Sequence, residues 1–226
     1  MEGPFDFDKQ TVVRLESITP DAELHLMRDA RISSKDRNSD RTGLITYLIK
    51  HGHWSPFEMV HIKMYVECSR AIARQILRHR SFSFQEFSQR YQTVDVIRKD
   101  RVRWEARLES DKNRQSSLGI QDPEARQLIQ TEFDNVQERV WQCAIKAYNE
   151  CINAGIAREQ ARALLPEGLT FTRMCMAGTL RSWIHYIDLR TKQDTQYEHR
   201  VVAEKAKALI ALQCPVVAKA LGWTVA

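Results

Sequence analysis

The residues best suited to chemistry lie close together between positions 78 and 91. Two arginines flank a histidine there, as Arg78, His79 and Arg80, and a polar and aromatic segment follows from Ser81 to Tyr91. At the edge of a cleft the two guanidinium groups would form a clamp for a phosphate or an electron-rich ring. At the C-terminus of a helix they would instead compensate the macrodipole. Taken alone, the three residues leave both interpretations open.

The segment that follows favours a ligand. Glu86, Ser88 and Arg90 alternate, so an extended backbone would present an acceptor, a hydroxyl and a guanidinium on one side. Such a row suits a polar heterocycle and its phosphate, although it is also typical of an exposed strand edge. Ser88 has no histidine and aspartate partner nearby in the sequence, so we expect it to bind substrate rather than act as a nucleophile.

Hydrophobic patterns predict the elements that must position these residues. A strand is predicted at 12–18, and a second one at 60–68, where every alternate residue is apolar. Helices are predicted after the cap at 19–21, after Ser39 as far as Gly52, and from Ser69 to His79. The last of these helices runs directly into the Arg-His-Arg triplet and would therefore position it.

Helices dominate the second half of the chain. After a polar loop at 81–89 and a strand at about 90–97, residues 98–121 are rich in charge and are expected to form an exposed, mobile connection. A long helix is predicted from Asp122 to Gly155. Further elements are a short helix at 157–165, a strand at 169–176, and helices at 179–189, 194–213 and from Pro215 onward. The long helix has an apolar stripe formed by Ala125, Leu128, Ile129, Phe133, Val136, Val140, Cys143, Ala144, Ala147, Tyr148 and Cys151.

This order of elements predicts an α+β fold. We expect a single, helix-dominated domain over residues 1–226, with a small antiparallel or mixed sheet packed against helices. In the helix at 179–189, Arg181, His185 and Asp188 share one face. A polar face of this kind is usually solvated, but its three types of hydrogen-bonding group also suit a ligand.

Composition restricts how a nucleotide could be held. The 226 residues include only eight glycines, and none of them form a GxGxxG or GxxxxGK motif. Phosphate cradles of the Rossmann and P-loop types are therefore excluded, so side chains must do the binding. The net charge of +5 favours anionic ligands: small nucleotides, anionic cofactors or nucleic acid.

The cysteines and histidines argue against a disulfide framework or a metal. The five cysteines are scattered and lie in or beside apolar stripes, so we expect buried structural thiols in a reducing, cytoplasmic compartment. His51, His53 and His61 have no carboxylate or thiolate at ligand spacing, so no metal is predicted. The N-terminus does not have the order of a signal peptide, and no apolar run is long enough for a membrane span.

Arg78-His79-Arg80, seven further residues and then Ser88 resemble the RHR-x7-S signature of the flavin-dependent thymidylate synthases. Three more blocks resemble that family in the same order. They are the histidine loop at 51–58, the G-x-x-x-E-x-A-R-x-x-L-P segment at 155–166, and the helix from Arg181 to Arg190 followed by Gln196 and Glu198. Together the blocks cover most of residues 50–200.

The resemblance implies roles for individual residues. Those expected at the FAD are His53, Ser55, Arg78, His79, Arg80, Glu86, Thr179, Leu180, Arg181 and His185. Those expected at dUMP are Gln75, Arg78, Glu86, Phe87, Ser88, Gln89, Arg90, Arg162 and Arg190. The chain departs from the family pattern at Thr179, where an asparagine is more usual, and at Thr195, where alanine is more usual. His185 also stands where other members use asparagine.

The family's activity is the reductive methylation of dUMP to dTMP. The resemblance implies that methylenetetrahydrofolate supplies the carbon, that NADPH is the reductant through FAD, and that the protein is a homotetramer with shared sites. It makes Arg190 the activating, catalytic residue, and a guanidinium can stabilise negative charge that develops on the pyrimidine. No nucleic acid or membrane partner is expected. Two alternatives stay open: a basic nucleic-acid-binding module, and a flavin- and folate-dependent methyltransferase acting on another uridine substrate.

Overall fold

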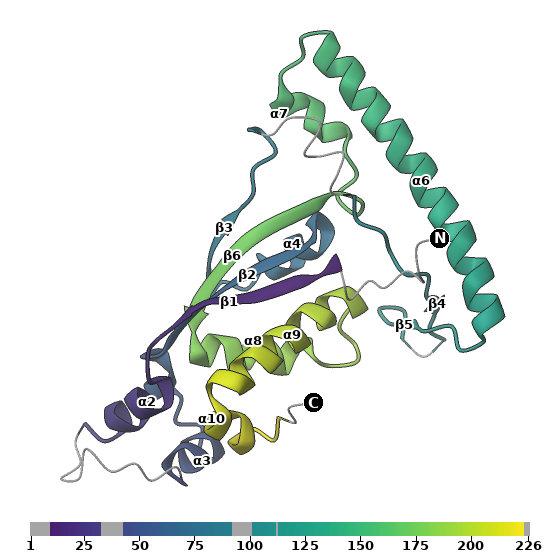
Figure 1. Cartoon of the computed structure of the whole chain (residues 1–226). Helices are drawn as coiled ribbons and strands as arrows, with labels where there is room; N and C mark the ends of the chain where they lie inside the picture. Colours follow the sequence, from purple (N-terminus) through teal and green to yellow (C-terminus); the bar gives the residue numbers. More distant parts are fainter. Residues whose placement is uncertain (1–9, 33–42, 92–100, 112, 224–226) are drawn as a thin grey trace.

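A four-stranded sheet lies at the centre of the protein (Figure 1). The computed structural model describes residues 10–32, 43–91, 101–111 and 113–223. The strand order is β1 (Val12–Ile18), β2 (His61–Ser69), β6 (Phe171–Thr179) and β3 (Ser83–Glu86), and every neighbouring pair is antiparallel. The predicted α+β class is therefore confirmed, with an antiparallel sheet.

The alternation along β2 positions the sheet as predicted. Ile62, Met64 and Val66 are buried, whereas Lys63 and Tyr65, which point to the other face, are only half-buried. The buried side chains face a layer of helices formed by α4 (Arg70–Ile76), α8 (Leu180–Arg190), α9 (Tyr197–Gln213) and α10 (Pro215–Ala220). The polar alternate residues face away from these helices and form what we call the open face of the sheet.

Helices α4 and α8 begin in the same way, each directly after a central strand. Oγ of Ser69 accepts from the backbone N–H of Ile72 at 3.2 Å, and Oγ1 of Thr179 accepts from Ser182 N–H at 3.2 Å. Each hydroxyl satisfies a donor that the first helical turn leaves unpaired. The two central strands therefore deliver two helices to the same side of the sheet.

Three shorter helices lie at one end of the sheet. They are α2 (Ala22–Ala30), α3 (Gly43–Lys50) and the 3-10 helix η1 (Ser55–Glu58). The ring of Phe57 in η1 is fully buried in the main core, which anchors the histidine loop at 51–58. None of the helices in the described part of the chain is long and apolar enough to cross a membrane.

Two sequence predictions around the signature are wrong. The polar segment at 81–89 contains β3, which pairs with β6, so it is not simply a loop. The strand expected at about 90–97 does not begin at Arg90, because the backbone N–H of Tyr91 donates to Ser88 in a turn. The rest of that strand, residues 92–97, lies outside the described residues.

The charged segment at 98–121 is only in part the exposed connection that its composition predicts. In its described part, Arg101 forms an isolated bridge to Thr170, and the strands β4 (Leu108–Glu109) and β5 (Ser117–Leu118) form a hairpin. Nε1 of Trp104 donates to Gly168 O at 2.7 Å, and Val102 is buried. Backbone pairing and the apolar side chains of Val102 and Trp104 attach this segment to the rest of the protein, although charged residues dominate its composition.

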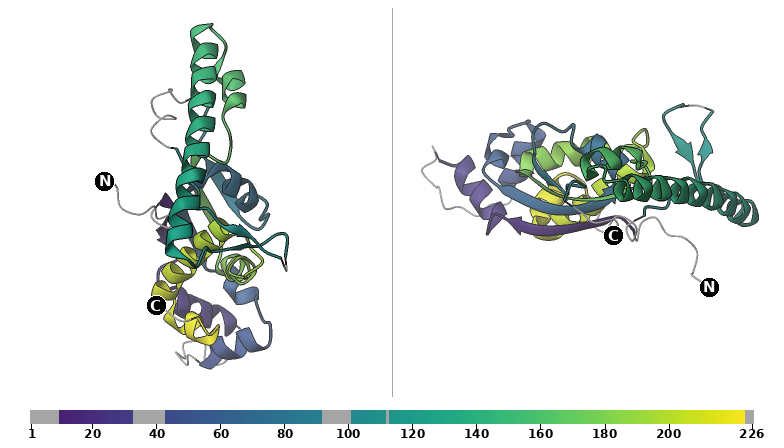
Figure 2. Two further views of the ribbon diagram at one scale, coloured as in Figure 1. Left: turned by 90° about the vertical axis from the view of Figure 1, so that its right-hand side faces the viewer. Right: turned by 90° about the horizontal axis from the view of Figure 1, so that it is seen from above.

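The long helix α6 (Pro123–Asn153) begins at the predicted Asp122 cap, but its buried face coincides with only part of the predicted stripe. Leu128, Phe133, Val136 and Val140 are exposed. The helix buries Trp141, Ile145 and Tyr148 in a small second core with α7 (Arg158–Ala161) and the segment up to Leu169. Its buried polar residue Gln137 accepts from Trp104 N–H at 2.8 Å. Figure 2 shows α6 extending past the helices that cover the sheet.

The cysteine prediction is confirmed for only two positions. Cys68 and Cys214 are buried, and burial raises the pKa of each thiol to about 12. Cys151 and Cys175 are half-buried and Cys143 is exposed, contrary to expectation. Cys143 is exposed because it lies on α6, whose predicted apolar stripe does not face the core.

Candidate functional site

The signature triplet meets the end of α8 at a single contact. Helix α4 ends at Ile76, so Arg78, His79 and Arg80 lie in the turn after it, with both arginines exposed and His79 half-buried. Arg190 is the last residue of α8, and its Nε donates to Nε2 of His79 at 2.9 Å. Residues 111 positions apart are thus joined.

The electrostatics of this contact keep His79 neutral. Burial, and secondly the charge of Arg190, lower the pKa of His79 to about 4. A neutral ring that accepts at Nε2 carries its proton on Nδ1. Because Arg190 uses Nε for this bond, its two terminal nitrogens remain to meet a negatively charged group. Arg190 and His79 form a clamp of one cation and one neutral donor.

A buried polar chain lies beneath this clamp, and sequence reasoning missed most of it. Nε2 of His199 lies 3.1 Å from the hydroxyl of Tyr186, and its Nδ1 lies 3.2 Å from Oε1 of Gln75. Nε2 of Gln75 donates to Oε1 of Gln196 at 2.6 Å. The Tyr186 ring also packs edge-on against His79, with centroids 4.9 Å apart. The available signal was a histidine on the apolar face of the helix at 194–213, three residues before Val202.

Several residues expected at the flavin come together at the start of α8. Oε1 of Glu58 accepts from Arg181 at 2.6 Å, and its Oε2 accepts from Thr179 at 2.7 Å. These bonds, that from Thr179 first, lower the pKa of Glu58. The Trp54 ring packs edge-on against His185 at 4.9 Å between centroids. The histidine loop thus lies against the face of α8 that carries Arg181 and His185.

Other members of the expected flavin set are placed differently. His53 and Ser55 are exposed in the same loop as Trp54, and His53 lies near the ring of Tyr47. Leu180 is fully buried in the main core, and its N–H donates to Val60 O at 2.7 Å. A side-chain contact from Leu180 to a ligand is therefore excluded in this arrangement. Glu58 was missing from the expected set, although it lies within the histidine loop.

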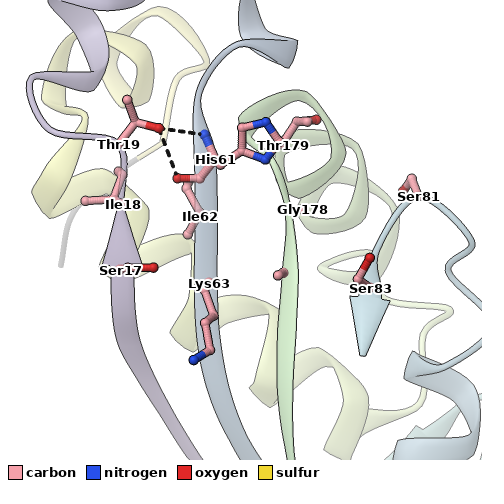
Figure 3. Close-up of a pocket in the computed structure, with 11 residues that line it drawn as sticks. Ser17, Ile18, Thr19, His61, Ile62, Lys63, Ser81, Ser83, Gly178 and Thr179 are labelled. Carbon is pink, nitrogen blue, oxygen red and sulfur yellow. Dashed lines mark hydrogen bonds between the residues drawn. The ribbon is translucent and has the colours of Figure 1, made fainter. Parts of the chain in front are cut away.

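A shallow pocket of about 490 Å³ opens beside Thr179 (Figure 3). Lys63 and the hydroxyl groups of Ser81 and Ser83 line it, together with Gly178. A Cβ atom on Gly178 would lie 2.5 Å from the Phe82 ring, so glycine is required for the close packing of that ring. One cation and several hydroxyls suit an anionic group next to the residues at the start of α8.

The second part of the signature lies at another pocket. Glu86, Phe87 and Ser88 line a pocket of about 390 Å³ with Tyr65 and Tyr91. Gln75, His79 and Arg190 do not line it. The residues expected at dUMP therefore do not all line one pocket of the single chain.

The predicted row of Glu86, Ser88 and Arg90 does not form. Glu86 accepts from Oγ1 of Thr172 at 2.9 Å and lies 3.5 Å from the buried Arg70 guanidinium. The chain then turns, since Oγ of Ser88 accepts from Arg90 N–H at 3.4 Å and leaves Arg90 exposed. The alternation assumed an extended backbone, which the turn at 88–91 interrupts.

Two further residues expected at dUMP, Gln89 and Arg162, do not line this pocket. Gln89 is buried, and its Nε2 has no hydrogen-bond partner among the residues that the structure describes. Arg162 begins the 3-10 helix η2 (Arg162–Leu164), and its Nε donates to Glu159 O at 3.3 Å. In the view of Figure 1, α7, which directly precedes Arg162, lies above the sheet and α8 lies below it.

Comparisons with known proteins identify the family of this chain. A family model described as thymidylate synthase complementing protein matches residues 14–216. The flavin-dependent thymidylate synthase of Synechocystis sp. (strain ATCC 27184 / PCC 6803 / Kazusa) is 44% identical over 195 residues, which are 86% of each chain. The probable flavin-dependent thymidylate synthase of Paramecium bursaria Chlorella virus 1 is 42% identical and covers 86% of this chain and 88% of its own.

A solved structure shares the fold over nearly the whole chain. The UMP/dUMP methylase PolB from Streptomyces cacaoi, bound with 5-Br dUMP, superposes with a TM-score of 0.77 at 25% identity and covers 94% of both chains. The same methylase bound with 5-Br UMP gives a TM-score of 0.75. The family match, the relatives and the shared fold lead to one conclusion: this chain belongs to the family of flavin-dependent thymidylate synthases and is an enzyme of that type.

Proposed function

We propose that this enzyme converts dUMP to dTMP, with FAD as its cofactor, methylenetetrahydrofolate as the carbon donor and NADPH as the reductant. The observation that carries the proposal is the bond from Arg190 to His79. It joins the signature triplet to the last residue of α8 and leaves a cation with directed donors at the edge of the helical layer. A pyrimidine that must accept a hydride at C6 needs such a cation.

The chemistry of the donor set fits FAD. Arg78 and Arg80 are exposed cations suited to a pyrophosphate, and Ser55, Arg181 and His185 offer donors along one side of α8. When bound, FAD supplies hydride transfer. Glu58 holds the Arg181 side chain through a bond of 2.6 Å, so this donor is oriented before a ligand arrives.

Arg190 acts on the pyrimidine by charge. Its guanidinium stays cationic, so it stabilises the negative charge that develops on the ring at N3 and the adjacent oxygens as C6 becomes electrophilic. Neutral His79 accepts from Nε and thereby restricts rotation of the guanidinium without competing for its charge. The Gln75 amide, held on two sides, offers a further donor and acceptor to the uracil edge.

The separation of the site residues supports a homotetramer with shared sites. Within one chain, Glu86 and Ser88 line a pocket that Arg190 and His79 do not line. The exposed apolar side chains on α6 offer a surface that a second copy can cover. A site completed between subunits would bring the separate sets to one nucleotide.

A second substrate is favoured by one specific observation. The solved structure that shares this fold is described as a UMP/dUMP methylase. UMP should therefore be tested as a substrate in parallel with dUMP. The nucleic-acid-binding alternative has no such support, and a cytoplasmic location stays a prediction.

The proposal is tested by purifying the protein and recording its visible spectrum and its turnover. Bound FAD should give yellow absorbance. With methylenetetrahydrofolate and NADPH present, dUMP tritiated at C5 should release its label into water. A protein that neither carries nor takes up FAD would contradict the proposal, and release from UMP alone would reassign the substrate. Binding to random DNA should be weak and nearly independent of salt.

A further inference from the structure

His199 lies at the centre of the buried polar chain, yet nothing above gives it a role in the reaction. Its side chain is fully buried in α9, whereas most residues of that buried face are apolar. A buried polar group is costly unless it is hydrogen-bonded, and both ring nitrogens of His199 have partners.

The two contacts determine which nitrogen carries the proton. Nδ1 faces Oε1 of Gln75 at 3.2 Å, and an amide oxygen can only accept. Nδ1 must therefore donate, and Nε2 accepts from the hydroxyl of Tyr186 at 3.1 Å. Burial, then the charges of Arg190 and His79, lower the pKa of His199 to about 3, which agrees with a neutral ring. Tyr186 is also neutral, because burial raises its pKa above the ordinary value.

This tautomer orients the Gln75 amide. Gln75 receives the Nδ1 proton at Oε1 and gives one Nε2 proton to Gln196 at 2.6 Å. An amide has two donors and two oxygen lone pairs, so one donor and one lone pair remain for a ligand. Without His199, rotation about the last side-chain bond would exchange the amide oxygen and nitrogen.

We propose that His199 is a positioning residue of the substrate site, which orients the Gln75 amide toward the uracil edge of dUMP and is itself oriented by Tyr186. The inference rests on the proposed function, because it takes dUMP as the ligand of Gln75. His199 does not touch the substrate. It acts through one hydrogen bond, so its loss should weaken binding of the nucleotide and leave the FAD in place.

Two conservative variants separate the two bonds of the ring. The amide of His199→Asn occupies the place of Nδ1 and can still donate to Gln75. The amide of His199→Gln occupies the place of Nε2, so it keeps the acceptor for Tyr186 and loses the donor to Gln75. The measurement is the Kd of dUMP for the FAD-loaded protein without folate, by titration calorimetry, so that no turnover is needed.

His199→Gln should raise the Kd about tenfold, the effect of one lost hydrogen bond, and His199→Asn should stay within about threefold of the parent. In a Gln75→Ala background, His199→Gln should change the Kd no further. Val202→Ala truncates a buried side chain on the same helix and is the control for a loss of stability. It should leave the Kd of dUMP unaltered.

The outcomes distinguish the two proposals. A parent protein that binds FAD but not dUMP overturns the proposed function. A parent that binds dUMP, with a His199→Gln Kd equal to its own, overturns only the role of His199. That role also fails if His199→Asn binds as weakly as His199→Gln, or if the effect persists in the Gln75→Ala background, since either result would show a general structural defect.

Discussion

Helices α8 and α6 both bury an apolar face, but only in α6 does much of the apolar stripe stay exposed. In α8, Trp183, Ile184 and Ile187 are buried, and the polar face with Arg181 and His185 is exposed. In α6 the predicted stripe is divided: Leu128, Phe133, Val136 and Val140 are exposed, whereas Tyr148 is buried beside Gln137, Trp141 and Ile145.

The difference shows where each helix finds its partner. Helix α8 packs on the sheet of its own chain, which the alternation along β2 already requires. Helix α6 extends past the main body (Figure 1), and among the described residues it packs on α7, η2 and the segment at 101–107. An apolar stripe indicates that a face of the helix is buried. It does not indicate whether the element that buries it belongs to the same chain.

The largest expected effect compares the buried tryptophans of the two helices. Trp183→Ala should lower the free energy of unfolding by about 3–5 kcal/mol, because it opens a cavity in the main core and removes a donor to Ile62 O. Trp141→Ala affects only the second core, so hydrogen exchange should accelerate in α6 and α7 while the amides of β2 and β6 keep their protection. Equal loss of protection in β2 would show that the two cores unfold together.

The next effect concerns arginines on the two helices. Arg190→Ala should reduce kcat for dTMP formation by about 10²–10³-fold while the flavin absorbance stays, because a cation that stabilises developing charge is lost. Arg126→Ala on α6 breaks an exposed ion pair of 2.7 Å with Glu105 and should leave kcat unchanged. Steady-state kinetics on the FAD-loaded proteins measure kcat for dTMP formation in both variants. Unchanged turnover in Arg190→Ala would remove its assigned role.

The exposed stripe of α6 gives a third test. Val136→Glu combined with Val140→Glu should weaken self-association at least about 100-fold, because charges would be buried without partners between subunits. Asn135→Glu, on an exposed polar position of the same helix, is the matched control. Sedimentation velocity over a range of concentrations measures the assembly. An unchanged tetramer in the double variant would mean that another surface holds the subunits.

The smallest expected effect is the pH dependence caused by His199. Its pKa of about 3 in the folded protein lies below the ordinary 6.5, so the unfolded chain binds more protons between these values. Stability is therefore complete above pH 6.5 and falls as the pH decreases, by up to about 1.4 kcal/mol per pH unit. Urea unfolding at pH 7, 6 and 5 should show a steeper fall than in His199→Asn. Parallel curves for the two proteins would contradict a neutral, buried His199.

Much of the fold could be predicted because its signals are local. The alternation in β2, the helix starts near Ser69, Asp122 and Thr179, and the apolar face of α8 depend on a few consecutive residues, and the structure contains all of them. The segment at 98–121 was misjudged because two buried side chains and a backbone bridge outweigh its charge. The row from Glu86 to Arg90 failed because one turn reverses the alternation.

By itself, the sequence determined which residue types can meet a nucleotide, the order of the elements, and the family signature at 78–88. Only the tertiary structure decided that Arg190 bonds to His79, that Glu58 holds Arg181, and that His199 and Tyr186 support Gln75. Each of these pairs joins different elements of the fold. Periodicity and capping act over one or two turns of chain, whereas such contacts exist only after the sheet has brought α4, α8 and α9 to the same face.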